Sequence, residues 1–187
     1  MRQMAVDFSK LSVLIVENHA LMRRLLQEML RGFGVLHIAL ARNVPEGLKA
    51  IYAEHYDAVV LDFFLGDLDG ADFARQVRHD ETCRNRSVPI LLITGQPDHH
   101  KVLKVRDAGI NGMMAKPIAP KDLYWRLNVL LARPRPFVVS ANYVGPMREA
   151  APPVSASPGR YRRPAAGHLP EIHHFRTAVG ADEQLFM

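Results

Sequence analysis

The sequence of 187 residues contains a single cysteine, Cys83, so no disulfide can form within the chain and the thiol suits a reducing compartment. No stretch approaches the roughly 18 consecutive apolar residues that a membrane-spanning helix needs. The apolar run near the N-terminus is short, ends at Glu17 and lacks a small-residue cleavage site after it, which indicates a strand rather than a signal peptide. These absences favour a cytoplasmic protein that does not enter a membrane.

Dense basic clusters are also absent. The chain has 24 Lys and Arg against 19 Asp and Glu, a modest net charge of +5 that does not by itself indicate a nucleic-acid partner. We find no helix-turn-helix pattern, no zinc-ligand spacing and no glycine-rich phosphate loop. Hydrophobic residues make up 48% of the chain, which is enough for a substantial core.

The first 132 residues alternate between two kinds of segment. Apolar runs of strand length occupy residues 11–16, 35–40, 58–62, 88–94 and 111–116. Between and after them, helical spacing of apolar residues covers 19–34, 44–55, 69–80, 98–109 and 119–133. Near-continuous apolar runs are typical of parallel strands buried on both faces. The alternation predicts an α/β fold of the (βα)5 type, a doubly wound parallel five-stranded sheet in a three-layer sandwich.

The composition changes at residue 133. Residues 133–187 contain eight of the thirteen prolines and seven arginines but no lysine, and show no sustained hydrophobic periodicity. We therefore predict one folded core domain over 1–132 and an extended Pro/Arg-rich tail over 133–187, disordered or loosely docked. Two alternatives stay open inside the tail, a short strand at 137–139 and a short helix at 169–179. Nucleic-acid binding through "GRYRRP" (159–164) is a weaker alternative.

Polar residues stand at or just after the ends of four predicted strands. Glu17 and Asn18 follow the first strand, and Asp62 ends the third. Thr94 ends the fourth strand and Lys116 ends the fifth. Because the carboxyl ends of parallel strands meet at one edge of a sheet, where ligands bind, we expect these five side chains to converge in one crevice.

The chemistry of these five residues fits phosphoryl transfer. Asp62 can act as the nucleophile toward phosphorus. Glu17 and Asn18 supply oxygen ligands of the kind that Mg²⁺ prefers. Thr94 and Lys116 can stabilise the negative phosphoryl oxygens. Each residue alone is a weak indicator, whereas the five in this order on these strands are much more specific.

Over about the first 130 residues the chain resembles the receiver (CheY-like) domain of two-component response regulators. The segments that carry the resemblance are "LIVENHALMRRLL", "YDAVVLDFFLGDLDG", "PILLITG" and "GMMAKPI". The resemblance implies a flavodoxin-like fold, Asp62 as phospho-acceptor, Thr94 and Lys116 as switch hydroxyl and lysine, and a cis bond before Pro117. The Mg²⁺ ligands that it implies are Glu17, Asn18, Asp62 and the backbone carbonyl of Phe64.

Three positions depart from the family's usual pattern. Asn18 is neutral where a second acid is usual, which should weaken Mg²⁺ binding. Gly66 replaces a common proline in the loop after the acceptor strand. Met113 occupies the position of the aromatic switch residue, so a rotamer flip of tyrosine or phenylalanine is not available and methionine would have to repack instead.

The resemblance also implies how the protein works. It would accept a phosphoryl group from a histidine kinase or phosphotransfer protein, hydrolyse it from its own aspartate only, and signal by contact with a downstream protein target. The face made by the fourth helix, fifth strand and fifth helix is the expected contact surface and a common homodimer surface of the family. Its exposed basic candidates are His99, Lys101, Lys104, Arg106, Lys121 and Arg126. A phosphorylation-independent binding or scaffold module is the main alternative, because of Asn18 and Met113.

Overall fold

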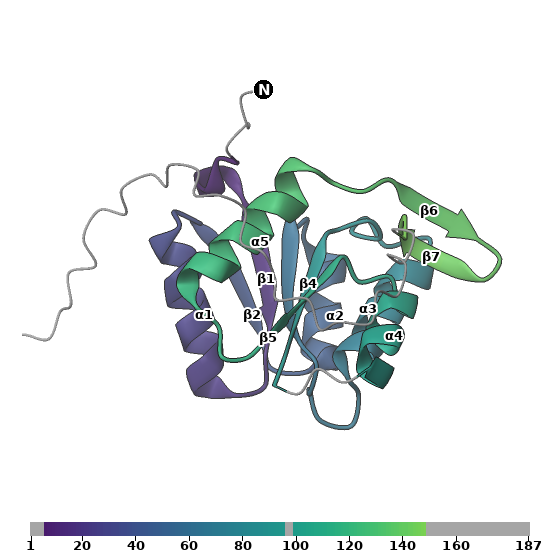
Figure 1. The fold of residues 1–187 in the computed structure, drawn as a ribbon, viewed down its shortest axis with the longest axis horizontal. Helices are drawn as coiled ribbons and strands as arrows, with labels where there is room; N and C mark the ends of the chain where they lie inside the picture. The colour runs from purple at the N-terminus through teal and green to yellow at the C-terminus, as the bar shows by residue number, and fades with distance from the viewer. Residues whose placement is uncertain (1–5, 96–98, 149–187) are drawn as a thin grey trace, which may run out of the picture. The chain divides into compact units, whose positions relative to one another are not determined.

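A computed structural model of the protein describes residues 6–95 and 99–148. Its centre is a five-stranded parallel sheet with the strand order β2-β1-β3-β4-β5 (Figure 1). The strands are β1 Ser12–Val16, β2 His37–Ala41, β3 Ala58–Asp62, β4 Ile90–Thr94 and β5 Gly112–Ala115. The predicted parallel (βα)5 sheet is thereby confirmed, with strand ends displaced by no more than two residues from the expected ones.

The strand register brings the carboxyl ends of the inner strands to one edge of the sheet. Val16 of β1 lies opposite Leu61 of β3, and Asp62 lies opposite Ile93 of β4. Thr94 in turn lies opposite Ala115 of β5. Residues that end these strands, or directly follow them, are therefore neighbours even though they are far apart in the sequence.

Five helices alternate with the strands, as the apolar spacing predicts. They are α1 Ala20–Gly32, α2 Val44–Ala53, α3 Gly70–His79, α4 His99–Asp107 and α5 Pro120–Ala132. Side chains that accept hydrogen bonds from the first turn begin three of them, His19 before α1, Asn43 before α2 and Asp69 before α3. These caps give α1, α2 and α3 defined starting points, whereas Ala119 before α5 makes no side-chain cap hydrogen bond.

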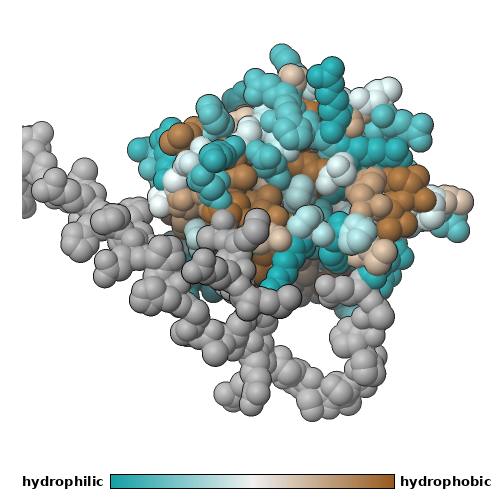
Figure 2. Space-filling view, turned by 90° about the horizontal axis from the view of Figure 1, so that it is seen from above, coloured by the Kyte–Doolittle hydropathy of each residue, from teal (hydrophilic) through white to brown (hydrophobic). Residues whose placement is uncertain are grey.

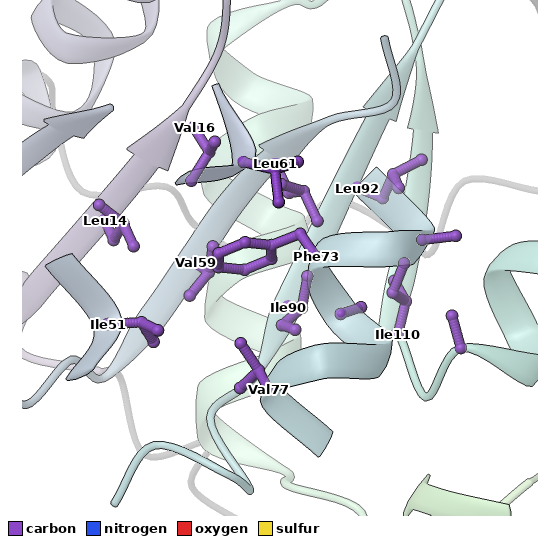
Figure 3. Packing of buried hydrophobic residues seen from close by; sticks show 14 of the residues in the cluster. Leu14, Val16, Ile51, Val59, Leu61, Phe73, Val77, Ile90, Leu92 and Ile110 are labelled. Atoms are coloured by element: carbon purple, nitrogen blue, oxygen red, sulfur yellow. The ribbon is translucent and has the colours of Figure 1, made fainter. Parts of the chain in front are cut away.

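The core consists of two clusters, one on each face of the sheet. Leu14, Val59 and Leu61 face a layer formed by α2, α3 and α4, in which Phe73 of α3 reaches in among the strand residues (Figure 3). Their neighbours along the strands face the other layer, formed by α1 and α5. This alternation is what a strand buried on both faces requires, and every residue of β3 and β4 is buried.

A β-hairpin follows α5. Its strands, β6 Phe137–Ser140 and β7 Tyr143–Pro146, pair antiparallel in a separate two-stranded sheet (Figure 1). The short strand considered at 137–139 lies within β6, and the ordered chain continues past the predicted boundary at residue 132. The compact unit that contains the sheet extends from Met1 to Glu149. The helix considered at 169–179 and the arginine-rich stretch at 159–164 lie outside the described residues.

The hairpin escaped prediction because its sequence signal is weak. Each strand has four residues, and prolines stand at both ends of the segment, Pro136 before β6 and Pro146 at the end of β7. Strands this short show no periodicity that separates them from a Pro-rich tail.

Within the described part of the chain, no helix has both the length and the apolar character that crossing a bilayer would require.

Candidate functional site

Three strand ends bring two carboxylates and one ammonium group into contact. Lys116, directly after β5, places Nζ 2.8 Å from Oδ1 of Asp62 and 3.0 Å from Oε2 of Glu17. Asp62 ends β3 and Glu17 follows β1, and their side chains are only 5% and 1% exposed. The lysine is partly open to solvent, with 23% of its side chain exposed. A small ionic cluster therefore lies at the expected edge of the sheet, with its charges largely shielded from water.

The remaining carboxylate oxygens are oriented by backbone N–H groups. The amide of His19 donates to Oε1 of Glu17 at 3.0 Å, and the amide of Phe64 donates to Oδ2 of Asp62 at 3.1 Å. Oδ1 of Asp62 differs from them. It is buried and, apart from its ion pair with Lys116, has no hydrogen-bond donor, the only such side-chain atom in the described part of the chain. An oxygen of this kind gains from a further positive or hydrogen-bonding ligand.

The surroundings of Lys116 keep it charged. Burial alone would lower its pKa, but hydrogen bonding to Asp62 and Glu17 and attraction by both carboxylates outweigh that effect and raise the pKa above its usual value. A charged ammonium beside the acceptor candidate suits a site that must hold a multiply charged anion, because its attraction is strengthened by partial burial.

Arg23 is a member of the site region that the sequence did not reveal. Its Nη1 donates to the carbonyl oxygen of Glu17 at 2.8 Å and lies 3.4 Å from that of Asn18. The contact holds the loop between β1 and α1, while the Asn18 side chain remains exposed. A long side chain in the first turn of a helix points back toward the preceding loop, but the adjacent Arg24 made that role impossible to assign from the sequence.

Thr94 and Met113 occupy different environments. Thr94 ends β4 and is fully buried, and its carbonyl oxygen accepts a hydrogen bond from the amide of Lys116 at 2.8 Å. Met113 of β5 lies opposite Leu92 of β4 and packs against the core cluster on the side of α3 and α4. The peptide bond that joins Lys116 to Pro117 is cis.

The loop after β3 is attached to α4 by charged and aromatic contacts. Phe64 is 50% exposed, and the ammonium of Lys101 lies 5.2 Å from the centroid of its ring. Lys104 forms an ion pair with Asp69, the residue that caps α3. Both lysines belong to the basic surface expected on the fourth helix, but Lys104 is directed toward this loop instead of being a freely solvated charge.

The oxygen donors at the sheet edge fit a magnesium ion. They are the carboxylates of Glu17 and Asp62, the amide oxygen of Asn18 and the carbonyl of Phe64. No cluster of three His, Cys, Asp or Glu side chains suited to a metal occurs among residues 6–95 and 99–148. Mg²⁺ nevertheless requires only one or two carboxylates, since it keeps several waters and prefers oxygen ligands. The buried Asp62 Oδ1, which has no partner besides the Lys116 ammonium, is consistent with such a ligand.

Comparison with known proteins gives one consistent family. The family model described as "Response regulator receiver domain" matches residues 13–128. The chemotaxis protein CheY of Pseudomonas aeruginosa is 28% identical over 123 residues, which are 66% of this chain and 98% of that protein. The two-component response regulator PhoP of the same species is 32% identical over 140 residues, 73% of this chain and 59% of PhoP.

Solved structures agree with these sequence matches. A putative response regulator from Chloroflexus aurantiacus superimposes with a TM-score of 0.60 at 32% identity, covering 66% of this chain and 98% of its own. A two-component response regulator from Clostridium difficile gives a TM-score of 0.60 at 26% identity over the same shares. The hairpin at 137–146 lies beyond the residues that the family model matches.

Proposed function

The chain belongs to the receiver domain family of response regulators, and from that premise we propose that Asp62 is the residue that accepts the phosphoryl group. Response regulators receive phosphate from histidine kinases and act on downstream targets, as signalling proteins rather than conventional enzymes. The observation that supports the assignment is the placement of Asp62 at the carboxyl edge of the sheet, 2.8 Å from the Lys116 ammonium.

The transfer step requires one nucleophilic oxygen and a means of holding negative charge. A carboxylate oxygen of Asp62 attacks the phosphorus of a phosphohistidine on the kinase or phosphotransfer protein. The new P–O bond forms as the P–N bond breaks, and the imidazole nitrogen keeps the electron pair. The Phe64 amide holds the carboxylate in position, and Lys116 neutralises part of the charge on the phosphoryl oxygens. Attack of water on phosphorus later restores the free carboxylate.

Receiver domains of this family generally bind Mg²⁺ at their acidic pocket, and the oxygen donors present here support a proposal for its ligands. Glu17, Asn18, Asp62 and the Phe64 carbonyl would hold the ion, which when bound supplies positive charge beside the phosphoryl group. Asn18 contributes an amide instead of a carboxylate. We therefore expect Mg²⁺ affinity to be weaker than with two acids at the β1 end.

Signal transmission would begin at Thr94 and Lys116. Both would move toward the phosphoryl oxygens, shifting the ends of β4 and β5. Because Met113 packs against the core beside Leu92, any change at that position would be a repacking of a flexible thioether and not the flip of an aromatic ring. The change would then reach the surface through α4, the helix that follows β4.

Mass spectrometry of the intact protein tests the assignment. We expect the chain to gain the mass of one phosphoryl group when incubated with Mg²⁺ and acetyl phosphate, and to gain none after chelation of the metal. Asp62→Asn should abolish the gain, while Asp67→Asn, which changes an acid in the same loop, should leave it intact. Equal labelling of the Asp62→Asn variant would assign the acceptor to another residue.

A phosphorylation-independent scaffold is the second candidate, and one observation favours it. Lys116 already pairs with both carboxylates, and Asn18 supplies no third charge. The Asn18→Asp variant separates the two functions. Under the phosphoryl-acceptor proposal it should bind Mg²⁺ more tightly in calorimetry and label faster. Absence of labelling in both the natural chain and this variant, at saturating Mg²⁺, would favour the scaffold.

A further inference from the structure

The hairpin docks at the edge of the sheet opposite to the phosphoryl site. Val144 is only 6% exposed, and Gly145 and Pro146 are also buried. They lie against Gly109, which separates α4 from β5 near the start of that strand. Seen from above, an apolar patch lies over the hairpin at the right of the molecule (Figure 2). The hairpin is therefore packed on the domain mainly through β7 instead of projecting into solvent.

The contact between the hairpin and Gly109 is a direct approach of two backbones. Gly109 has φ +75°, and a Cβ atom added there would come within 2.5 Å of the Val144 carbonyl oxygen. A Cβ atom on Gly145 would come within 2.6 Å of the Gly109 Cα. No side chain fits between the two segments. A displacement of the residues around Gly109 would therefore disturb the docking of β7 directly.

Charged residues extend this contact to the end of α4. Nη2 of Arg148, just after β7, lies 3.0 Å from Oδ1 of Asp107, the last residue of α4. Arg135, just before β6, donates to the carbonyl oxygen of Asn111. The hairpin thus holds both the last residue of α4 and the residue that precedes β5.

A buried arginine of α3 also binds the loop between α4 and β5. Arg78 of α3 is fully buried and donates to the carbonyl oxygens of Gly109 at 2.9 Å and Val88 at 2.7 Å. Its guanidinium lies 5.7 Å from the ring centroid of Phe137 in β6. The hairpin therefore rests on the group that fixes the loop between α4 and β5.

α4 is also attached to the loop that borders the phosphoryl site. Lys104 pairs with Asp69 in the loop after β3, and Lys101 stacks over Phe64, whose amide holds Asp62. Only Val105 of α4 is buried. A helix with so little buried surface is held mainly by its polar contacts, which places it among the elements that move at low cost.

We propose that the hairpin is a regulatory element that holds α4 in the position seen here, and that phosphorylation of Asp62 weakens its docking. The proposal rests on the proposed function. A phosphoryl group on Asp62 changes the positions of the Phe64 loop and of Thr94, which is separated from α4 by four residues. α4 transmits the displacement to Asp107 and Gly109, where the close contact with Gly145 tolerates little movement. By linkage, releasing the hairpin makes the phosphorylated state easier to reach.

Hydrogen exchange of the full chain with Mg²⁺ and beryllofluoride, a stand-in for the phosphoryl group, tests this directly. We expect peptides that cover 137–147 to exchange at least about fivefold faster when beryllofluoride is bound, the lower range of coupling between sites. The Asp62→Asn variant should show no change. Exchange around Phe64 reports independently whether beryllofluoride binds.

The two kinds of failure are distinguishable in the same experiment. If exchange around Phe64 changes but exchange of the hairpin does not, the hairpin is not coupled to the site and this inference is overturned alone. If neither region responds, beryllofluoride does not bind and the proposed function fails together with the inference.

A surface variant measures the reciprocal effect without disturbing the core. Arg148→Gln removes the ion pair with Asp107, and we expect it to tighten beryllofluoride binding about twofold to fivefold, the range of a partly exposed pair. Arg31→Gln, which removes an exposed ion pair with Glu28 on α1, is the matched control and should leave the affinity unchanged. An unchanged or weaker affinity in Arg148→Gln contradicts the proposal.

Discussion

α3 and α4 cover the same face of the sheet, yet they are attached to it in different ways. α3 buries six residues, among them Phe73 and Arg78, and begins with a capping box formed by Asp69 and Asp72. α4 buries only Val105. Its other residues are mostly histidines and charged side chains, and its two remaining apolar residues, Val102 and Leu103, are not buried. The same layer therefore contains one helix that belongs to the core and one that is held mainly by polar contacts.

The difference shows how a small domain combines stability with a movable part. Burial of apolar surface stabilises α3 against displacement, because a shift would open cavities around Phe73. α4 is held by the Lys104–Asp69 pair along its length and by Arg148 at its last residue, contacts that can exchange partners at small cost. We therefore expect perturbations of α3 to lower global stability and perturbations of α4 to change local exchange and coupling.

The largest effect is expected for Phe73→Ala. Phe73 is fully buried, and its removal should lower the free energy of unfolding by about 3–5 kcal/mol in urea denaturation. Val105→Ala, the corresponding truncation on α4, should cost only about 1.5 kcal/mol, the value of two buried methyl groups. Equal losses in the two variants would mean that α4 is as much a part of the core as α3.

Replacement of Arg78 tests the second anchor of α3. Arg78→Met removes the donor to the carbonyls of Gly109, Arg86 and Val88, which would remain buried without a partner. We expect a loss of about 3 kcal/mol in urea denaturation and faster proteolysis in the hairpin. Arg75→Met is the matched control on the same helix, and its partly exposed pair with Asp72 should contribute under about 1 kcal/mol.

Arg78 also illustrates what the sequence could not reveal. Burial lowers its pKa to about 10, which still leaves it charged at neutral pH, and a buried charge is the opposite of what an arginine in "ARQVRHD" suggests. Its partners are the backbone oxygens of Arg86, Val88 and Gly109 and the side-chain oxygen of Asn111. They belong to two separate loops, and no local pattern encodes them. The docking of the hairpin over Arg78 could not be predicted either, since it depends on the backbone at Gly109.

The strand ends were predictable because they depend on local pattern alone. Apolar runs set the lengths of β1, β3 and β5, and parallel pairing then brings Glu17, Asp62 and Lys116 to one edge. The observed ion pairs of Lys116 with both carboxylates agree with that expectation. The positions of side chains in the loops that follow the strands were less predictable. Asn18 is exposed, and Arg23 holds the loop carbonyls instead.

A glycine pair sharpens the comparison at the junction between α4 and the hairpin. Gly109 and Gly34 both have positive φ, +75° and +98°, so alanine at either position costs about 1–2 kcal/mol of backbone strain. A Cβ at Gly34 meets no atom within 4 Å, whereas at Gly109 it meets the Val144 carbonyl at 2.5 Å. Gly109→Ala should therefore destabilise more than Gly34→Ala in urea denaturation, and it alone should speed hydrogen exchange in β6 and β7. Similar exchange in both variants would show that the hairpin is not seated on Gly109.

The smallest expected effect is a loss of stability at low pH through Asp72 of α3, which Lys104 of α4 attracts. Burial alone would raise the pKa of Asp72, but the hydrogen bond from the Asp69 amide and the attraction of Lys104 and Arg75 outweigh it and hold the pKa below its usual 3.8. A lowered pKa in the folded state means that this stabilisation is complete above the unfolded value and disappears as pH falls through the folded value.

Urea denaturation from about pH 5 down to about pH 2.5 checks this sign. We expect the stability difference between the natural chain and Asp72→Asn, which keeps the shape of the cap, to shrink as pH falls. The Lys104→Gln variant should show a smaller pH-dependent difference, because the attraction from α4 is then absent. A difference that stays constant over this range would mean that the charge of Asp72 contributes nothing to the start of α3, and that α4 touches its neighbour there without stabilising it.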